Sequence, residues 1–319
     1  MHRKKIAIIG ECMIELNGTP FGEMQQSFGG DTLNAAVYLK RMSGEQVDAS
    51  YITAIGNDQL SKMMCECWQE EHINTEMVLS DTDHSTGLYM IHVDPHGERT
   101  FQYWRNHSAA KYLLQHPDFP LIAEQLLTVD VVFLSGITLA ILSQQDRHAL
   151  LIVLKKCKAS GVKVAFDSNH RPALWSNNVT AKIAYREIYE LCDIALVTFD
   201  DEQLVWQDAK PTDTLARLKR CGISKAVIKL GEQGCLSQDF NHDNNPTKTP
   251  AVKVDRVVDT TSAGDSFNGA FLALYIKGQD LSKCCAAGNL LASQVIQYPG
   301  AVTPRTVTNA IYNTIKESL

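Results

Sequence analysis

The fold of this chain is decided by one stretch of sequence, which begins with Val131-Val-Phe-Leu-Ser135 and ends with Lys163-Val-Ala-Phe-Asp167. Both ends are short apolar runs of the kind that form buried strands, and residues 144–158 between them have the pattern of a helix. A strand, a helix and a second strand in this order predict two parallel strands joined by a right-handed crossover.

The same alternation continues on both sides of this unit. We expect further strands at 5–9, 50–55, 194–198 and 226–230, and helices at 31–40, 181–192, 213–221, 264–276, 281–296 and 306–317. The chain is therefore predicted to be an α/β protein, with a mainly parallel central sheet flanked by helices. Catalytic groups should gather at the carboxyl ends of the strands.

One further helix is predicted from a stripe of apolar side chains. Leu60, Met63, Met64, Cys67 and Trp68 recur at the spacing that places them on one helical face. We expect this stripe to pack into the core.

Two segments, at about 11–29 and 86–106, interrupt the alternation. Apolar and polar residues alternate in both, and residues 88–93 and 100–104 predict an antiparallel hairpin that turns at Asp94-Pro-His-Gly97. Together the two segments are expected to form a small sheet outside the main one, which would serve as a lid or an interface. We expect a single domain over residues 1–319, with residues 241–250 as a surface loop.

Composition excludes several classes of function. The net charge of -6 argues against a broad nucleic-acid-binding surface. Apolar runs stay well short of the ~20 residues of a membrane span, and the first apolar segment is too short for a signal peptide. The nine cysteines contain no C-x-x-C pair, which favours reduced thiols and a cytoplasmic location. We expect neither a membrane nor a nucleic acid as partner.

The most informative motif is Asp259-Thr-Thr-Ser-Ala-Gly-Asp265, which leads into a helical pattern. Unpaired backbone N–H groups at the start of a helix bind anions without needing a lysine. Asp265 by itself could be a helix-stabilising charge, but the preceding small residues favour an anion pocket. Beside such a pocket, an aspartate can act as general base on a substrate hydroxyl.

A second glycine-containing motif is Phe28-Gly-Gly-Asp-Thr-Leu-Asn34. It fits a tight turn followed by a helix cap. It also fits a binding site, in which Gly30 lets a polyol approach the backbone while Asp31 and Asn34 lie near its hydroxyl groups. Neither the P-loop pattern, the dinucleotide G-x-G-x-x-G after the first strand, nor H-E-x-x-H occurs in the chain.

At these two motifs the chain resembles the PfkB/ribokinase family of carbohydrate kinases, and the resemblance extends in order and spacing over essentially the whole chain. It implies a ribokinase-like fold, ATP and Mg²⁺, Asp265 as catalytic base, and an anion hole formed by backbone N–H groups at Ala263, Gly264 and Asp265. Ser262 stands where the family usually has glycine. Since serine is also small, we expect the anion hole to be retained.

Within the family, the resemblance is to kinases of sugar acids. It rests on Gly10-Glu-Cys-Met-Ile-Glu-Leu16, Gly97-Glu-Arg-Thr-Phe-Gln-Tyr-Trp-Arg-Asn106, Leu134-Ser-Gly-Ile137 and Asp167-Ser-Asn-His-Arg171. It implies phosphorylation of the C6 hydroxyl of 2-keto-3-deoxygluconate, with Ile137 near the sugar. Arginine can bind a carboxylate through two hydrogen bonds.

Four further side chains are candidates for this sugar acid. By themselves Arg105 and Arg171 are typical of surface salt bridges, and Tyr89 and Tyr103 of strand packing. The resemblance assigns all four to the substrate.

The resemblance also indicates a nucleotide site. Lys229-Leu-Gly-Glu-Gln-Gly234 matches the family's turn over the nucleotide, which implies Lys229, Gly231 and Gly234 together with Ser262, Ala263 and Gly264. Asn289 fits an adenine contact or an ordinary polar position on a helix. The stretch Thr198-Phe-Asp-Asp201 departs from the family's Asn-x-x-Glu but keeps one carboxylate, so Asp201 is a candidate for an indirect metal contact. A monovalent cation stays an open possibility.

Two alternatives remain open at this point. One is a kinase of another sugar or sugar acid, of the ribokinase or fructokinase type. The other is a non-catalytic regulator that binds a sugar acid. In each case the partner is a small molecule, and we expect the chain to form a homo-oligomer, a dimer or larger.

Overall fold

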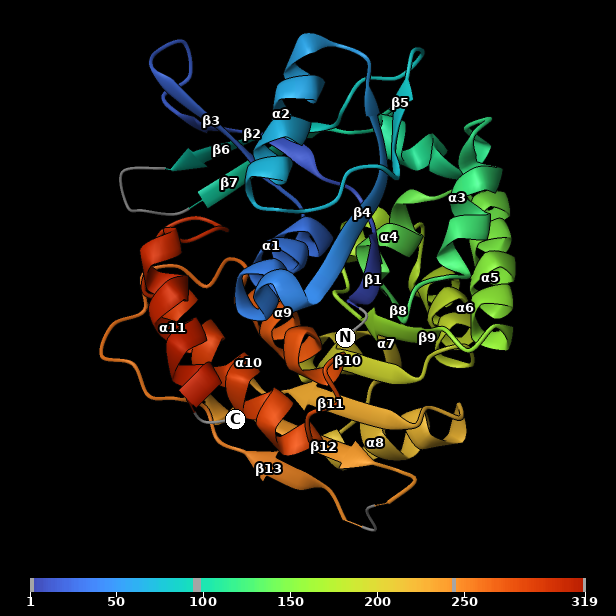
Figure 1. Cartoon of the computed structure of the whole chain (residues 1–319), viewed down its shortest axis with the longest axis vertical. Helices are drawn as coiled ribbons and strands as arrows, with labels where there is room; N and C mark the ends of the chain where they lie inside the picture. Colours follow the sequence, from blue (N-terminus) through green and yellow to red (C-terminus); the bar gives the residue numbers. More distant parts are fainter. Residues whose placement is uncertain (1–2, 94–98, 243–244, 318–319) are drawn as a thin grey trace.

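The computed structural model describes residues 3–93, 99–242 and 245–317, and these form two sheets with helices around the larger one (Figure 1). The main sheet has the strand order β13-β12-β11-β10-β9-β8-β1-β4-β5. Its strands are β1 Lys4–Ile9, β4 Val47–Gly56, β5 Val78–Asp81, β8 Val131–Ser135, β9 Lys163–Asp167, β10 Ile194–Thr198, β11 Lys225–Lys229, β12 Cys235–Asp239 and β13 Thr247–Thr249. The pairs from β5 to β11 are parallel, which confirms the predicted α/β sheet.

Helices cover both faces of this sheet because successive strand residues alternate between two cores. Ile6 and Ile8 of β1 point into one core, and Ala7 and Ile9 point into the other. The first face carries α1 Asp31–Ser43, α2 Gln59–Glu70, α9 Ala263–Tyr275, α10 Leu281–Val295 and α11 Arg305–Glu317. The second carries α3 Phe119–Leu126, α4 Gly136–Ile141, α5 Gln144–Ala159, α6 Asn178–Tyr189, α7 Phe199–Trp206 and α8 Pro211–Arg220.

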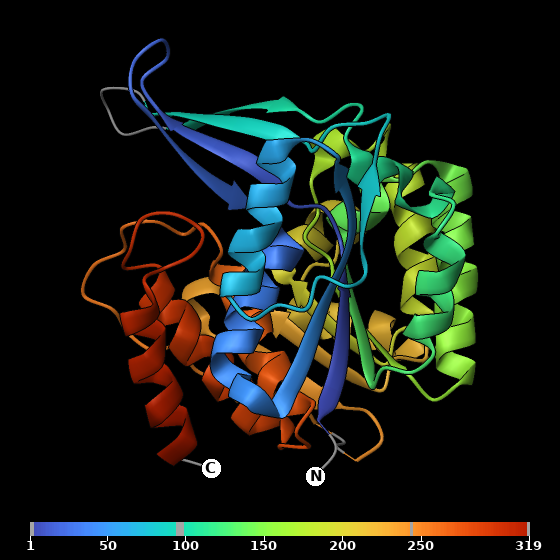
Figure 2. The same cartoon turned by 45° about the horizontal axis from the view of Figure 1, so that its top comes forward.

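The small sheet combines the two segments that interrupt the α/β alternation. Its order is β3-β2-β6-β7, from β2 Met13–Gly18, β3 Met24–Gly29, β6 Leu88–Val93 and β7 Arg99–Trp104. The predicted hairpin is confirmed as the antiparallel pair β6 and β7, while β2 pairs with β6 in parallel. Figure 2 shows this sheet across the end of the molecule opposite the two termini. The predicted turn at 94–97 lies outside the described residues.

Two predictions about local structure are only partly right. Met64 and Trp68 of α2 are buried as predicted, together with Ser61, but Leu60, Met63 and Cys67 are largely exposed. The buried Ser61 hydroxyl lies 2.7 Å from Thr86 Oγ1, so a polar contact belongs to the packed face of this helix.

The segment 241–250 is also not entirely a loop, because it contains β13, which pairs with β12. Short 3-10 turns lie at Gly44–Gln46, Ala109–Gln115, Pro172–Leu174 and Gly231–Gln233. No helix among the described residues combines the length and apolarity that crossing a bilayer would need.

Candidate active site

The carboxyl ends of the parallel strands meet at the edge of the main sheet that faces the small sheet (Figure 2). Strand order reverses beside β1, since β4 and β5 lie on one side of it and β8 to β13 on the other. Such a reversal leaves a crevice beyond the strand ends in which α/β proteins bind ligands. The residues of the candidate site come from the segments that follow these strands and from the first turns of α1 and α9.

Asp265 and Asn34 are brought together by close packing of α1 against α9. Asn34 donates from Nδ2 to Oδ2 of Asp265 at 2.9 Å. The two helices approach at Gly269, where an added Cβ would lie 2.7 Å from the carbonyl oxygen of Ala35. Glycine is therefore needed one turn beyond Asp265 for the two predicted motifs to meet.

The pKa of Asp265 is raised to about 7. Burial is the main cause, and the negative charge of Asp31 adds to it, while the hydrogen bond from Asn34 opposes the shift. A carboxyl group with this pKa can accept a proton near neutral pH and is suited to general base catalysis.

The first turn of α9 forms a smaller anion hole than the motif predicts. Ser262 has a φ of 64° and precedes the helix, whose first regular bond runs from Ser266 N–H to Ser262 O at 2.8 Å. Ala263 N–H is already used, since it donates to Thr260 O at 3.2 Å. Within the described chain Gly264 and Asp265 keep N–H groups without an acceptor. The prediction for Ala263 is thus corrected, because local turn geometry satisfies its donor.

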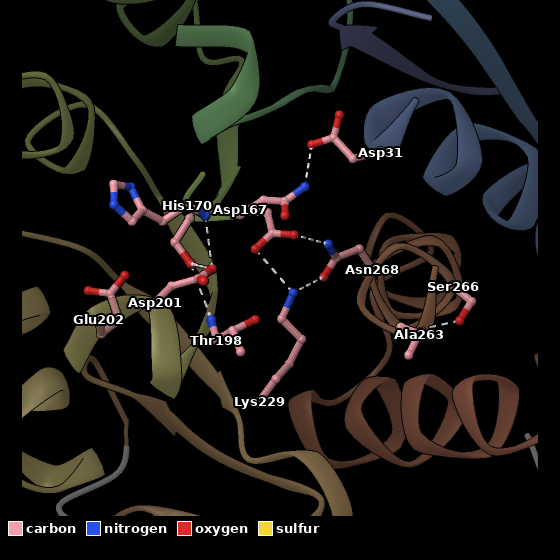
Figure 3. Close-up of polar contacts among 12 residues, drawn as sticks. Asp31, Asp167, His170, Thr198, Asp201, Glu202, Lys229, Ala263, Ser266 and Asn268 are labelled. Atoms are coloured by element: carbon pink, nitrogen blue, oxygen red, sulfur yellow. Dashed lines mark hydrogen bonds and ion pairs between the residues drawn. The ribbon is translucent and has the colours of Figure 1, made fainter. Parts of the chain in front are cut away.

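Asp31 begins α1 and faces the strand edge. Asn169, which follows β9, donates from Nδ2 to Asp31 Oδ2 at 2.6 Å (Figure 3). Burial raises the pKa of Asp31, and the charge of Asp167 contributes to the same shift. The packing also requires glycine at position 30, because an added Cβ would lie 2.2 Å from the carbonyl oxygen of Glu11.

A buried charged cluster lies between Asp31 and the anion hole (Figure 3). Lys229 Nζ contacts Asp167 Oδ1 at 3.1 Å and Asn268 Oδ1 at 3.3 Å, and Asn268 Nδ2 donates to Asp167 Oδ2 at 2.7 Å. Lys229 is predicted above as part of the nucleotide turn. Its side chain reaches toward α9, with Nζ 3.5 Å from where a Cβ on Gly264 would lie.

Asp201 is held at the start of α7. Its Oδ2 accepts from Ser168 Oγ at 3.0 Å and from His170 N–H at 3.0 Å (Figure 3). Burial raises the pKa of this carboxyl group. The described side chains contain no cluster of three His, Cys, Asp or Glu residues arranged for a metal.

Arg105, which the resemblance assigns to the substrate, is paired through its Nη2 with Glu11, and the two side chains are 11% and 1% exposed. Glu11 also accepts from Ser108 Oγ. Arg105 Nε is buried and has no acceptor among the described atoms.

Arg171 and Ile137 both follow the ends of strands of the main sheet. Arg171 is exposed just after β9, and its Nη1 donates to the carbonyl oxygen of His170 at 3.0 Å. Ile137 is half-buried in the first turn of α4, directly after β8. Both therefore lie at strand ends on the crevice edge.

The two tyrosines lie opposite each other on β6 and β7. Tyr89 is buried, and its hydroxyl donates a hydrogen bond to the Glu15 carboxylate. This carboxylate also accepts a hydrogen bond from Ser27 Oγ at 2.9 Å. Burial and the Glu15 charge raise the pKa of Tyr89. Tyr103 is 52% exposed, so of the two it has the hydroxyl that a substrate can reach.

On the nucleotide side, Gly231 and Gly234 form the turn between β11 and β12, with φ values of 57° and 87°. Asn289 donates from Nδ2 to the carbonyl oxygens of Thr249 and Pro250, at 3.2 and 3.0 Å. These bonds hold the chain after β13 against α10. The Asn289 Nδ2 group is therefore already bonded to the backbone, which favours an ordinary polar position on the helix over an adenine contact.

Sequence reasoning missed Glu11, Asp167, Asn169 and Asn268. A signal existed for Asp167, which is a charged residue at the carboxyl end of an otherwise apolar strand. Asn268 lies one helical turn after Asp265, on the same face of α9. Glu11 offered no comparable sign, because its partner Arg105 is 94 positions away.

Comparison with known proteins places this geometry in a family. The model of the pfkB family carbohydrate kinase matches residues 3–308. The chain is 49% identical to the 2-dehydro-3-deoxygluconokinase of Haemophilus influenzae over 94% of this chain and 95% of that protein, and 43% identical to that of Dickeya dadantii over 95% and 98%.

A solved structure shares the fold as well. The crystal structure of the 2-dehydro-3-deoxygluconokinase of Thermotoga maritima aligns with a TM-score of 0.81 at 19% identity, over 98% of this chain and 99% of that one. The ribokinase-like fold is thereby confirmed. With the family model covering nearly all of its residues, this chain belongs to the pfkB family of carbohydrate kinases.

Proposed function

We propose that this chain transfers the γ-phosphoryl group of ATP to the C6 hydroxyl of 2-keto-3-deoxygluconate, giving 2-keto-3-deoxy-6-phosphogluconate. The observation that carries the reaction type is Asp265, with a pKa of about 7, placed beside the free N–H groups of α9. The sugar acid is supported by the 49% identity to a 2-dehydro-3-deoxygluconokinase.

The residues divide the work as follows. Asp265 accepts the proton of the C6 hydroxyl, and Asn34 orients the carboxylate through its 2.9 Å hydrogen bond. The N–H groups of Gly264 and Asp265 stabilise the phosphoryl charge that develops. Asp31 and Gly30 bind sugar hydroxyl groups at the start of α1. Arg171 binds the carboxylate, with Arg105 and Tyr103 beside it and Ile137 under the sugar.

The small sheet closes over the sugar and excludes water, which would otherwise accept the phosphoryl group. ATP lies along the turn at Gly231 and Gly234 and reaches the start of α9. Asp201 is the residue that would contact Mg²⁺ through water, and the ion would supply positive charge to the phosphates. A dependence on a monovalent cation is tested by replacing potassium with a large organic cation in the assay.

We also propose that the chain forms a homo-oligomer. The small sheet exposes aromatic side chains at Phe101, Tyr103 and Trp104, which would be covered in part by a second copy. Light scattering on the purified chain measures the number of copies, and a monomer at all concentrations contradicts this proposal.

The substrate is tested by a coupled assay of ADP release, with 2-keto-3-deoxygluconate, gluconate, fructose and ribose at equal concentration. We expect a strong preference for the keto-deoxy acid. A preference for fructose or ribose would keep the kinase chemistry of Asp265 and reject the roles of Arg105 and Arg171. ATP binding without turnover of any of the four would favour a regulator.

A further inference from the structure

The ammonium group of Lys229 is held at the end of β11 by two acceptors from different elements. Nζ contacts Asp167 Oδ1 at 3.1 Å and Asn268 Oδ1 at 3.3 Å (Figure 3). Asn268 and Asp167 are themselves joined at 2.7 Å, so the three side chains form a closed ring. An ammonium group has three N–H donors. Two are used by this ring, and the third has no acceptor within the described chain.

The ring lies directly beside the anion hole. Nζ is 3.5 Å from the position of a Cβ on Gly264, whose N–H is one of the two unpaired donors of α9. Because Asn268 is on the same helix, the ring and the anion hole form one rigid unit. A phosphoryl group bound by the Gly264 and Asp265 N–H groups is therefore a neighbour of the ammonium group.

The charge balance of the crevice points to the same role. The negative charges of Asp31, Asp167, Asp201 and Asp265 act on one another in this crevice. The positive charge of Lys229 opposes the rise in the pKa of both Asp201 and Asp265. A polyphosphate entering among these carboxylates needs a full positive charge nearby. The end of a helix contributes only about half an elementary charge.

We propose that Lys229 is a catalytic residue, whose third N–H donates to an oxygen of the transferred phosphoryl group, with Asp167 and Asn268 as its positioning residues. This inference rests on the proposed kinase function.

The step itself balances without a further reactant. The C6 oxygen forms a bond to the γ-phosphorus, the bond from that phosphorus to the β–γ bridging oxygen breaks, and ADP keeps the electron pair. The C6 hydroxyl proton goes to Asp265. Lys229 keeps its proton throughout and supplies charge, which is most effective while the phosphoryl oxygens carry the transition-state charge.

The first test compares Lys229→Met with Lys225→Met. Both lysines belong to β11, but Lys225 lies at the opposite end of the strand and pairs with Asp239 there. We expect Lys229→Met to lower kcat by about 10²–10³-fold, as the loss of one transition-state donor does, with both KM values within about threefold. Lys225→Met should keep kcat within about twofold. A kcat for folded Lys229→Met within about tenfold of the wild type overturns the proposal.

A second experiment distinguishes a catalytic role of Lys229 from a purely structural one by also removing the charge of its partner, Asp167. Lys229→Met leaves the buried Asp167 carboxylate without a cation, which can itself destabilise the fold. Lys229→Met with Asp167→Asn removes both charges, and thermal melting checks that it folds. We expect this double variant to stay as slow as Lys229→Met. Recovery to within about tenfold of the wild type shows that the lysine only neutralises Asp167 and overturns its catalytic role.

The positioning role of Asn268 is tested by measuring kcat in two backgrounds. Asn268→Ala should lower kcat in the wild-type background and have no further effect in Lys229→Met, because the two act through the same group. Additive losses overturn the positioning role.

A failure of the substrate proposal is distinguishable from these results. If the wild type prefers another sugar of the panel, the same variants are measured on that sugar. Absence of transfer to every sugar overturns both proposals.

Discussion

Asn34 Nδ2 donates a 2.9 Å hydrogen bond to Asp265 Oδ2 across 231 positions of the chain. This bond joins the two glycine-containing motifs into one site, since each contributes one of the two partners. It also opposes the effect of burial on Asp265, because a donor to the charged form lowers the pKa of a carboxyl group. The net result is still a pKa of about 7, in the range where a general base is most useful.

Asp265→Asn is expected to fold and to lose turnover by about 10²–10⁴-fold, since removing a general base has effects of this size. The amide keeps the shape of the side chain and can still accept the hydrogen bond from Asn34. The measurement is kcat for ADP release with the preferred sugar. Retention of activity within about tenfold rejects Asp265 as the base.

The same variant should be more stable than the wild type at pH 8. The folded-state pKa of Asp265 is about 7, above the value of about 3.9 in an unfolded chain. The folded protein therefore holds a proton that the unfolded protein has lost between about pH 4 and pH 7, and the contribution of Asp265 to stability falls as the pH rises through this window. Melting curves at pH 5 and pH 8 should show an advantage of Asp265→Asn that grows with pH. A constant difference contradicts the raised pKa.

The rate of the wild-type enzyme should follow the ionisation of Asp265. We expect kcat/KM to fall about tenfold for each pH unit below about 7, because the base must be unprotonated in the free enzyme. Asp31→Asn removes a negative charge that raises the pKa of Asp265, so the fall in kcat/KM should begin at a lower pH in this variant. A flat profile down to pH 5 with coupling enzymes in excess contradicts this assignment.

The two arginines should behave differently when truncated. Arg171 is exposed and donates to the backbone of His170, so Arg171→Ala should change stability by no more than about 0.5 kcal/mol. We expect it to raise the KM for the sugar acid about tenfold or more, with the KM for ATP unchanged, because a charge-assisted hydrogen bond to the carboxylate is lost. Equal increases in both KM values contradict a carboxylate-binding role.

Arg105→Ala should mainly reduce stability. It leaves the Glu11 carboxylate, only 1% exposed, without its cation, which typically costs about 3–5 kcal/mol. Adding Glu11→Gln removes the unpaired charge and should restore much of the melting temperature, while the KM for the sugar acid stays high. Restoration of the KM together with stability would mean that Arg105 only pairs with Glu11.

Sequence reasoning succeeded where the signal is local. Strands β9 and β10 begin and end where their apolar runs do, and the start of α9 is visible in the small residues before Asp265. It failed where residues distant in the chain contact each other. Leu60 lies outside the core while the neighbouring Ser61 bonds to Thr86, and Arg105 pairs with Glu11. Hydrogen bonds between residues so far apart leave no periodic pattern in the chain.

Ser262 offers a last test, because it combines a local strain with the departure from the family's glycine. Its φ of 64° lies in the left-handed region, which costs a non-glycine residue about 1 kcal/mol or more, and its buried Oγ finds no hydrogen-bond partner among the described atoms. Ser262→Gly removes both penalties without touching the N–H groups of Gly264 and Asp265. We expect it to stabilise the fold by about 1 kcal/mol, raising Tm by roughly 2 °C in a chain of this size, and to keep kcat within about twofold.

Ser266→Gly is the matched control within the same helix, and it should destabilise the fold, since Ser266 is buried and its Oγ donates to Ala263 O at 2.9 Å. A loss of activity in folded Ser262→Gly would show that the serine hydroxyl itself contacts the phosphates, and would make the departure from glycine functional rather than tolerated.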